Sequence, residues 1–171
     1  HNYGKEREEE NWGRRRKVNF ENGSAKVEEH PHDPRNHFEL GVQYFELHAI
    51  SEAKKCYLKA IEIDANYYRA WCDLGIIYAR ERCYDEAADA LQKAIAINPN
   101  YSSSYVNLGI VYEALGKIDE AISVLKKAIV HDPHHANAHR HLGLLYFGQH
   151  RYQEAVDCFR KMRKLDPTIN I

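Results

Sequence analysis

The sequence repeats one short pattern four times, at intervals of 34 residues. The copies read HFELGVQY from His37, WCDLGIIY from Trp71, YVNLGIVY from Tyr105 and HRHLGLLY from His139. A fixed period of this length indicates a stack of similar units, because each unit needs its neighbours to bury its apolar surface. We therefore expect an array of repeats.

Within each period the apolar residues recur at helical spacing and predict two amphipathic helices. The first helices are expected at about 35–47, 68–81, 102–115 and 136–149, and the second helices at about 51–64, 84–97, 118–131 and 152–165. A glycine inside each first helix costs about 1 kcal/mol relative to alanine, which indicates close approach of a neighbouring helix. These glycines are Gly41, Gly75, Gly109 and Gly143, and the small residues expected on the second helices are Ala53, Ala87, Ala121 and Ala155.

The segment AWCDLGIIYARERCYDEAADALQKAIAINPN, residues 70–100, resembles a tetratricopeptide repeat, and so do the other three units. The resemblance covers residues 34–169, divided into 34–67, 68–101, 102–135 and 136–169. It implies an all-α fold: a right-handed superhelical solenoid of four helix-turn-helix repeats with a non-repeat N-terminal tail. Residues 170–171 would then leave the last unit without a solvating helix.

The resemblance also implies that the first helices line a concave groove that binds a peptide. An exposed apolar strip of this kind usually marks an interaction site, although neighbouring units could bury part of it. The heat-shock co-chaperones of this family hold a carboxylate with a clamp of Lys, Asn, Asn, Lys and Arg, and the matching positions here carry no lysine or arginine. The groove residues expected are Phe38, Val42, Arg69, Cys72, Ile76, Arg80, Val106, Asn107, Ile110, Arg140, Leu144 and Phe147.

Residues 1–33 are highly charged and poor in aliphatic side chains, which is typical of disorder in isolation. Asn22–Gly23 lies between short alternating segments and favours a hairpin as an alternative, and docking on a neighbouring subunit is another. The basic run 14–17 could touch nucleic acid or acidic lipid, but the acidic residues 6–10 beside it favour a local charge pair. The residues expected to mediate assembly are Trp12, Val18 and Phe20 in the tail and Phe159, Met162 and Leu165 on the last helix.

No catalytic or cofactor motif stands out in the sequence. Phosphate loops, a nucleophile elbow and paired carboxylates of defined geometry are not found, so we expect neither an enzyme nor a cofactor. His135 and His139 have the i, i+4 spacing of a metal-binding pair. However, His139 occupies the packing position of Trp71, and we therefore predict no metal site.

The charges, with 24 basic and 25 acidic residues, create no overall field that would attract nucleic acid. No apolar run approaches the roughly 20 residues of a membrane helix, so direct insertion is not expected. The four cysteines lack metal-binding spacing and favour a reducing compartment such as the cytoplasm. The chain begins with His1 and its only methionine is Met162, so a fragment or a processed chain is expected, which leaves an extracytoplasmic location as the alternative.

Three functions remain open at this point. The first is a non-catalytic scaffold that binds a protein segment in its groove. The second is a structural subunit that assembles head to tail into an oligomer or filament, through uncapped ends and the N-terminal tail. The third is a fragment of a larger enzyme that contains tetratricopeptide repeats.

Overall fold

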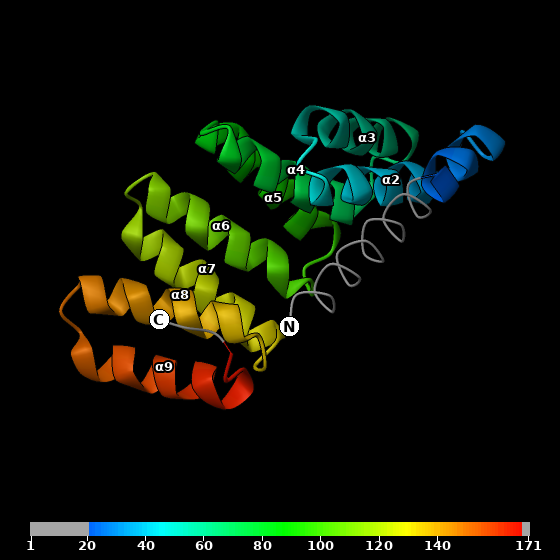
Figure 1. Cartoon of the computed structure of the whole chain (residues 1–171). Coiled ribbons are helices and arrows are strands. Elements are labelled where there is room, and N and C mark those ends of the chain that lie inside the picture. Colours follow the sequence, from blue (N-terminus) through cyan, green and yellow to red (C-terminus); the bar gives the residue numbers. More distant parts are fainter. Residues whose placement is uncertain (1–20, 169–171) are drawn as a thin grey trace, which may run out of the picture. The chain divides into compact units, whose positions relative to one another are not determined.

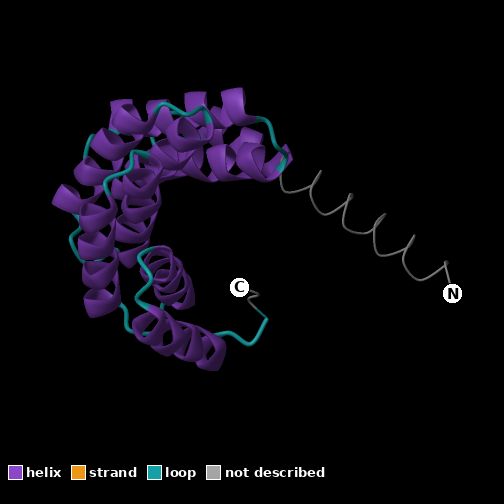
Figure 2. Cartoon of the chain, turned by 90° about the vertical axis from the view of Figure 1, so that its left-hand side faces the viewer, coloured by secondary structure: helices purple, strands orange, loops and turns teal. Residues whose placement is uncertain are grey.

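The computed structural model describes residues 21–168, and this part of the chain consists of helices and connecting loops (Figures 1 and 2). It divides into two compact units, residues 1–70 and 71–171. The expected all-α repeat fold is confirmed, and each of the eight helices lies within one residue of its predicted bounds.

The first unit contains α2 (Pro34–Glu46) and α3 (Ile50–Ile63), which pack side by side (Figure 1). Asp33 caps α2, because its carboxylate accepts a hydrogen bond from the backbone N–H of Arg35 at 2.9 Å. Pro34 follows at the first helical position, where its missing N–H has no cost. The α2–α3 hairpin is the first complete repeat of the array.

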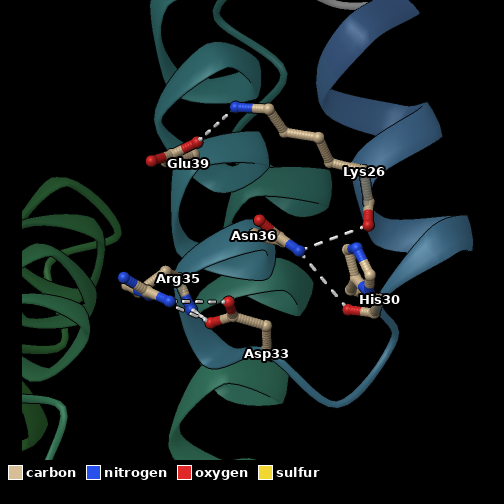
Figure 3. A network of polar contacts seen from close by, with 6 residues as sticks. All are labelled: Lys26, His30, Asp33, Arg35, Asn36 and Glu39. Carbon is tan, nitrogen blue, oxygen red and sulfur yellow. Dashed lines mark hydrogen bonds and ion pairs between the residues drawn. The ribbon is translucent and has the colours of Figure 1, made fainter.

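A further helix, residues 21–29, precedes α2 and lies against it (Figure 3). Lys26 Nζ is 3.3 Å from a carboxylate oxygen of Glu39 on α2. The side-chain amide of Asn36 donates hydrogen bonds to the carbonyls of Lys26 and His30, at 3.2 and 3.4 Å. The same two carbonyls also accept the backbone N–H groups of His30 and Asp33, so Asn36 adds a second hydrogen bond to each and ties the helix end to α2.

The hairpin expected around Asn22–Gly23 is therefore wrong for residues 21–29. Gly23 is buried, and a Cβ atom built on it would lie 2.6 Å from Oε1 of Gln43 on α2. Packing against α2 thus decides the conformation in place of the local turn signal. The remainder of the tail, residues 1–20, lies outside the described residues.

The second unit contains the residues of α4 (Tyr68–Arg80) from Trp71 onward, followed by five complete helices. These are α5 (Tyr84–Ile97), α6 (Ser102–Ala114), α7 (Ile118–His131), α8 (Ala136–Gly148) and α9 (Tyr152–Leu165). Each first helix pairs with the second helix that follows it, and α5 and α7 also pack against the next first helix, α6 and α8 (Figure 1).

A glycine-to-leucine contact holds each inner hairpin together. A Cβ atom on Gly75 would lie 2.7 Å from Cγ of Leu91, and one on Gly109 would lie 2.7 Å from Cγ of Leu125. Both leucines are fully buried. The glycine therefore allows two helices to approach more closely than any larger residue would, which offsets its low helix propensity.

A left-handed residue turns the chain between the two helices of every repeat. It is His48, Arg82, Gly116 and His150 in turn, with φ angles of 61°, 62°, 74° and 62°. The positions follow the 34-residue period, yet only the third carries the glycine that this conformation favours. Sequence alone therefore signals the turn at one repeat of the four.

Replacing Gly109 by alanine should lower the free energy of unfolding by about 1–3 kcal/mol, because the added methyl would overlap the buried Leu125 side chain. Gly148→Ala is the matched control, since a Cβ atom at Gly148 would meet nothing within 4 Å. Urea unfolding followed by circular dichroism measures both. If the two variants were equally stable, the close contact would not limit the size of residue 109.

Replacing Arg82 by glycine should raise the free energy of unfolding by about 1 kcal/mol, because glycine adopts the left-handed conformation without steric cost. Arg82→Ala removes the same exposed side chain but keeps a Cβ atom, and it should give no such gain. Chemical denaturation of the two variants separates backbone relief from side-chain loss. An equal gain in both would assign the effect to the side chain.

Candidate functional site

The main cavity of the second unit lies on the inner faces of α4, α6 and α8. These are the first helices of three successive repeats, so the 34-residue period brings equivalent positions to one surface. The cavity has a volume of about 470 Å³. Its walls are Cys72, Asp73, Ile76, Tyr101, Ser103, Val106, Asn107, Ile110, His135, Asn137, Arg140 and His141.

Six of the predicted groove residues line this cavity, and they differ in what they offer a ligand. Ile76 and Ile110 are half-buried and present apolar surface. Cys72 and Val106 are buried, so the expectation that they form an exposed strip is wrong: the packing of adjacent helices covers them. Asn107 and Arg140 supply the polar part of the predicted set.

The guanidinium group of Arg140 forms part of the cavity wall. Its Nε is buried and, within residues 21–168, has no hydrogen-bond partner. A buried donor without a partner is costly, and the charged guanidinium still lines the cavity. Carboxylate and peptide carbonyl oxygens are the acceptors that fit a guanidinium N–H.

The side chains of His141 and Cys72 in the cavity are held in their neutral forms. Burial lowers the pKa of His141, and the nearby charges of Arg140 and His135 lower it further. The imidazole is thus neutral at pH 7 and offers one donor and one acceptor. Burial raises the pKa of the Cys72 thiol to about 11, against smaller lowering effects of Ser104 and of the Asn107 amide, whose nitrogen lies 3.5 Å from the sulfur.

The other predicted groove residues lie elsewhere. Arg80 lines a second cavity of about 330 Å³, which shares Ile76, Asn107 and Ile110 with the first. Leu144 is half-buried, and Phe147 is exposed on α8 with its ring 5.6 Å from that of Tyr152.

Three predicted groove residues belong to the first unit. Phe38 packs its ring 5.6 Å from Tyr57 and 5.3 Å from Tyr67. Val42 is half-buried, and Arg69 is exposed beside the ring of Tyr68. These two tilted ring contacts make Phe38 part of the packing of this unit as well as a partly exposed surface residue.

Sequence reasoning missed Tyr101 and His135 as cavity residues. They are the N-cap residues of α6 and α8 and occupy the same position of two successive repeats. Neither supplies a side-chain cap for its helix, and both side chains line the cavity instead. The sequence did carry a signal for them: each is an aromatic residue at a helix start, where Ser, Thr or Asp would be usual.

The residues expected to mediate assembly have different environments. Trp12, Val18 and Phe20 lie outside the described residues. Phe159 is half-buried and lines a cavity on α9, and Leu165 is half-buried. Met162 is fully buried, so it offers no surface to another copy, contrary to expectation. The long side chain fills space where the other units have alanine.

Histidines act as packing residues at the same position of two repeats, the first and the fourth. Nε2 of His37 lies 2.8 Å from the Pro31 carbonyl oxygen, and Nε2 of His139 lies 3.0 Å from that of Pro133. Both rings are buried, and each donates the Nε2–H to its carbonyl. Among residues 21–168, no group of three His, Cys, Asp or Glu side chains could hold a metal ion, and no helix is both long and apolar enough to cross a membrane.

The helical hairpins, their period and the cavity on successive first helices define a tetratricopeptide-repeat protein. A family model, described as the Cilia and flagella-associated protein 70 C-terminal domain, matches residues 9–166. The chain belongs to this family. No curated protein sequence matches it.

Solved structures share the fold. A crystal structure of MamA is 28% identical, with a TM-score of 0.74 and coverage of 86% of each chain. TTC0263, a thermophilic TPR protein of Thermus thermophilus, is 23% identical, with a TM-score of 0.76 and coverage of 87% of this chain and 82% of that one. A chain of the APC/C hetero-tetramer Cut9–Hcn1 is 22% identical, with a TM-score of 0.83 over 91% of this chain and 30% of the other.

Cys72 should react more slowly with iodoacetamide at pH 8 than the partly exposed Cys83, because its high pKa leaves little thiolate at that pH. Raising the pH toward 11 should increase the alkylation rate of Cys72. Mass spectrometry of timed digests measures each site. Equal alkylation rates of Cys72 and Cys83 in the folded chain at pH 8 would contradict a buried, protonated Cys72. As a control, unfolding the chain in urea should make the two rates equal.

Proposed function

We propose that this chain is a non-catalytic interaction module that binds an extended segment of a partner protein in the cavity of α4, α6 and α8. One observation carries the proposal: three successive first helices contribute to a single cavity that combines apolar and polar walls. A cavity that follows a repeat array suits an extended chain, since it offers similar contacts at regular spacing.

The walls indicate the chemistry of the bound segment. Ile76 and Ile110 offer an apolar surface to one aliphatic or aromatic side chain of the ligand. Asn107 can pair with a peptide backbone, because its amide both donates and accepts. Arg140, a cation in the cavity wall, favours a carboxylate or carbonyl oxygen of the ligand on the α8 side.

A binding function also fits the ionisation states in the cavity. The buried thiol of Cys72 is protonated at neutral pH and is therefore a poor nucleophile. The neutral His141 offers hydrogen bonds without a charge that would need a counterion in the partly buried site. Recognition thus depends on shape and hydrogen bonding, with Arg140 as the cationic contact.

The family name refers to cilia and flagella. This supports a place for the module in a ciliary or flagellar assembly, where it would link a partner protein to a larger structure. The similarity to a chain of the Cut9–Hcn1 complex extends to the fold alone, so it supports no particular partner for this chain.

The double variant Ile76→Glu with Ile110→Glu should lose at least about tenfold in affinity for peptides selected on the native chain, because two carboxylates would replace the apolar wall. The probe is the strongest binder from a library of displayed 12-residue peptides, synthesised with a fluorescent label. Fluorescence anisotropy measures its binding.

Val130→Glu is the control, since this side chain is 77% exposed on α7 and lies outside the cavity. It introduces the same charge and should leave peptide affinity unchanged. Circular dichroism should give similar helix content for all three proteins, because the two isoleucines are only half-buried. Peptides that bind the double variant as tightly as the native chain would overturn the proposal.

A further inference from the structure

Helix α9 exposes a face that the preceding second helices bury. In the second unit α5 packs against α6, and α7 packs against α8. Among the described residues, no helix follows α9. The equivalent positions of the three helices show the consequence, because Ala88 and Ile122 are 7% and 6% exposed whereas Val156 is 42% exposed.

This face forms a shallow groove with an apolar floor. The cavity has a volume of about 450 Å³ and is lined by Val156, Phe159, Arg160, Arg163 and Lys164. Phe159 is held in place from the other side, because its ring packs against the backbone at Gly143, where a Cβ atom would approach within 2.7 Å. The floor is therefore set by the packing within the α8–α9 hairpin.

The rim of the groove differs in charge from its counterparts in the inner repeats. Arg163 replaces Ile95 and Ile129, which pack against the cores of their repeats. Lys164 stands where the earlier repeats have Ala96 and Val130. Arg160 lies 3.6 Å from Asp157 on the same helix, but both side chains are largely exposed, so this pair neutralises the rim only weakly.

We propose that this α9 groove, formed by Val156, Phe159, Arg160, Arg163 and Lys164, binds an amphipathic helix with acidic flanks from a partner protein. The inner repeats favour a helix as the occupant, because the equivalent surfaces of α5 and α7 each receive one. The charge follows from the rim, where three cations surround an apolar floor.

A second copy of the chain fits the groove less well. Two α9 faces brought together would place like charges opposite each other, which opposes association. Helix α2, the element that a head-to-tail contact would supply, is covered by its own helix 21–29, as the Lys26–Glu39 ion pair and the buried Gly23 indicate. A direct contact between α2 and α9 of two copies is thus blocked while helix 21–29 is in place.

Two synthetic probes test the proposal. Both are 14-residue amphipathic helices with leucines on one face, and their polar faces carry glutamate in one and lysine in the other. The whole chain should bind the glutamate peptide at least about tenfold more tightly than the lysine peptide. Added salt should reduce this difference, because the rim charges are exposed.

Charge reversal gives the sharper result. Arg160→Glu with Arg163→Glu should invert the preference, so that the lysine peptide binds more tightly. Val156→Glu should abolish binding of both peptides, whereas Ile76→Glu with Ile110→Glu in the α4–α6–α8 cavity should leave it unchanged. That last comparison keeps the α9 groove distinct from the proposed peptide site.

Three results would overturn the proposal. One is equal affinity for the two peptides, and another is no binding of either. The third comes from sedimentation of the chain alone: self-association that Val156→Glu removes would assign the α9 groove to a second copy. Circular dichroism of each variant confirms folding, and the exposed positions of Arg160 and Arg163 favour it.

Discussion

The contact between a glycine on one helix and a buried side chain on its partner determines the rest of this structure. At Gly75 and Gly109 the neighbouring leucine Cγ would lie 2.7 Å from an added Cβ atom, so the distance between the paired helices is set by the absence of a side chain. Because this contact recurs every 34 residues, each hairpin has nearly the same geometry. Equivalent positions on α4, α6 and α8 then face one surface, and the cavity follows from that repetition.

The helices and their bounds could be predicted because the period supplies four independent copies of each signal. Helix 21–29 was missed because its sequence lacks the pattern of the other second helices. At the repeat position that Leu91 and Leu125 occupy it has Gly23, and the pair Asn22–Gly23 favours a turn. One signal could have found it. Pro31 lies two periods before Pro99, and this helix ends at residue 29 just as α3 ends one period later at Ile63. The segment is thus in register with a second helix of the array.

The candidate site was predictable in its location and less so in the exposure of its members. The repeat fixes which residues of α4, α6 and α8 face inward, and Ile76, Ile110 and Arg140 lie there as expected. Exposure depends on how neighbouring helices pack, which the period does not determine. Cys72 and Val106 are covered for this reason, while Tyr101 enters the cavity from a helix N-cap that sequence patterns assign to the loop.

The α2–α3 and α8–α9 hairpins differ from the two hairpins between them in the residue that packs on the helix glycine. At the position of Leu91 and Leu125 they carry the aromatic residues Tyr57 and Phe159, each packed on the glycine of its own hairpin. A larger ring buries more apolar area within the hairpin. On α9 that ring also forms the floor of a groove whose rim has changed from isoleucine to arginine. The positive charges at this rim oppose the packing of two α9 faces from two copies of the chain. They favour an acidic helix as the partner that we propose. In the complex that we propose, Phe159 thus acts both within the hairpin and as the floor of the groove, while the rim cations set the charge of the partner.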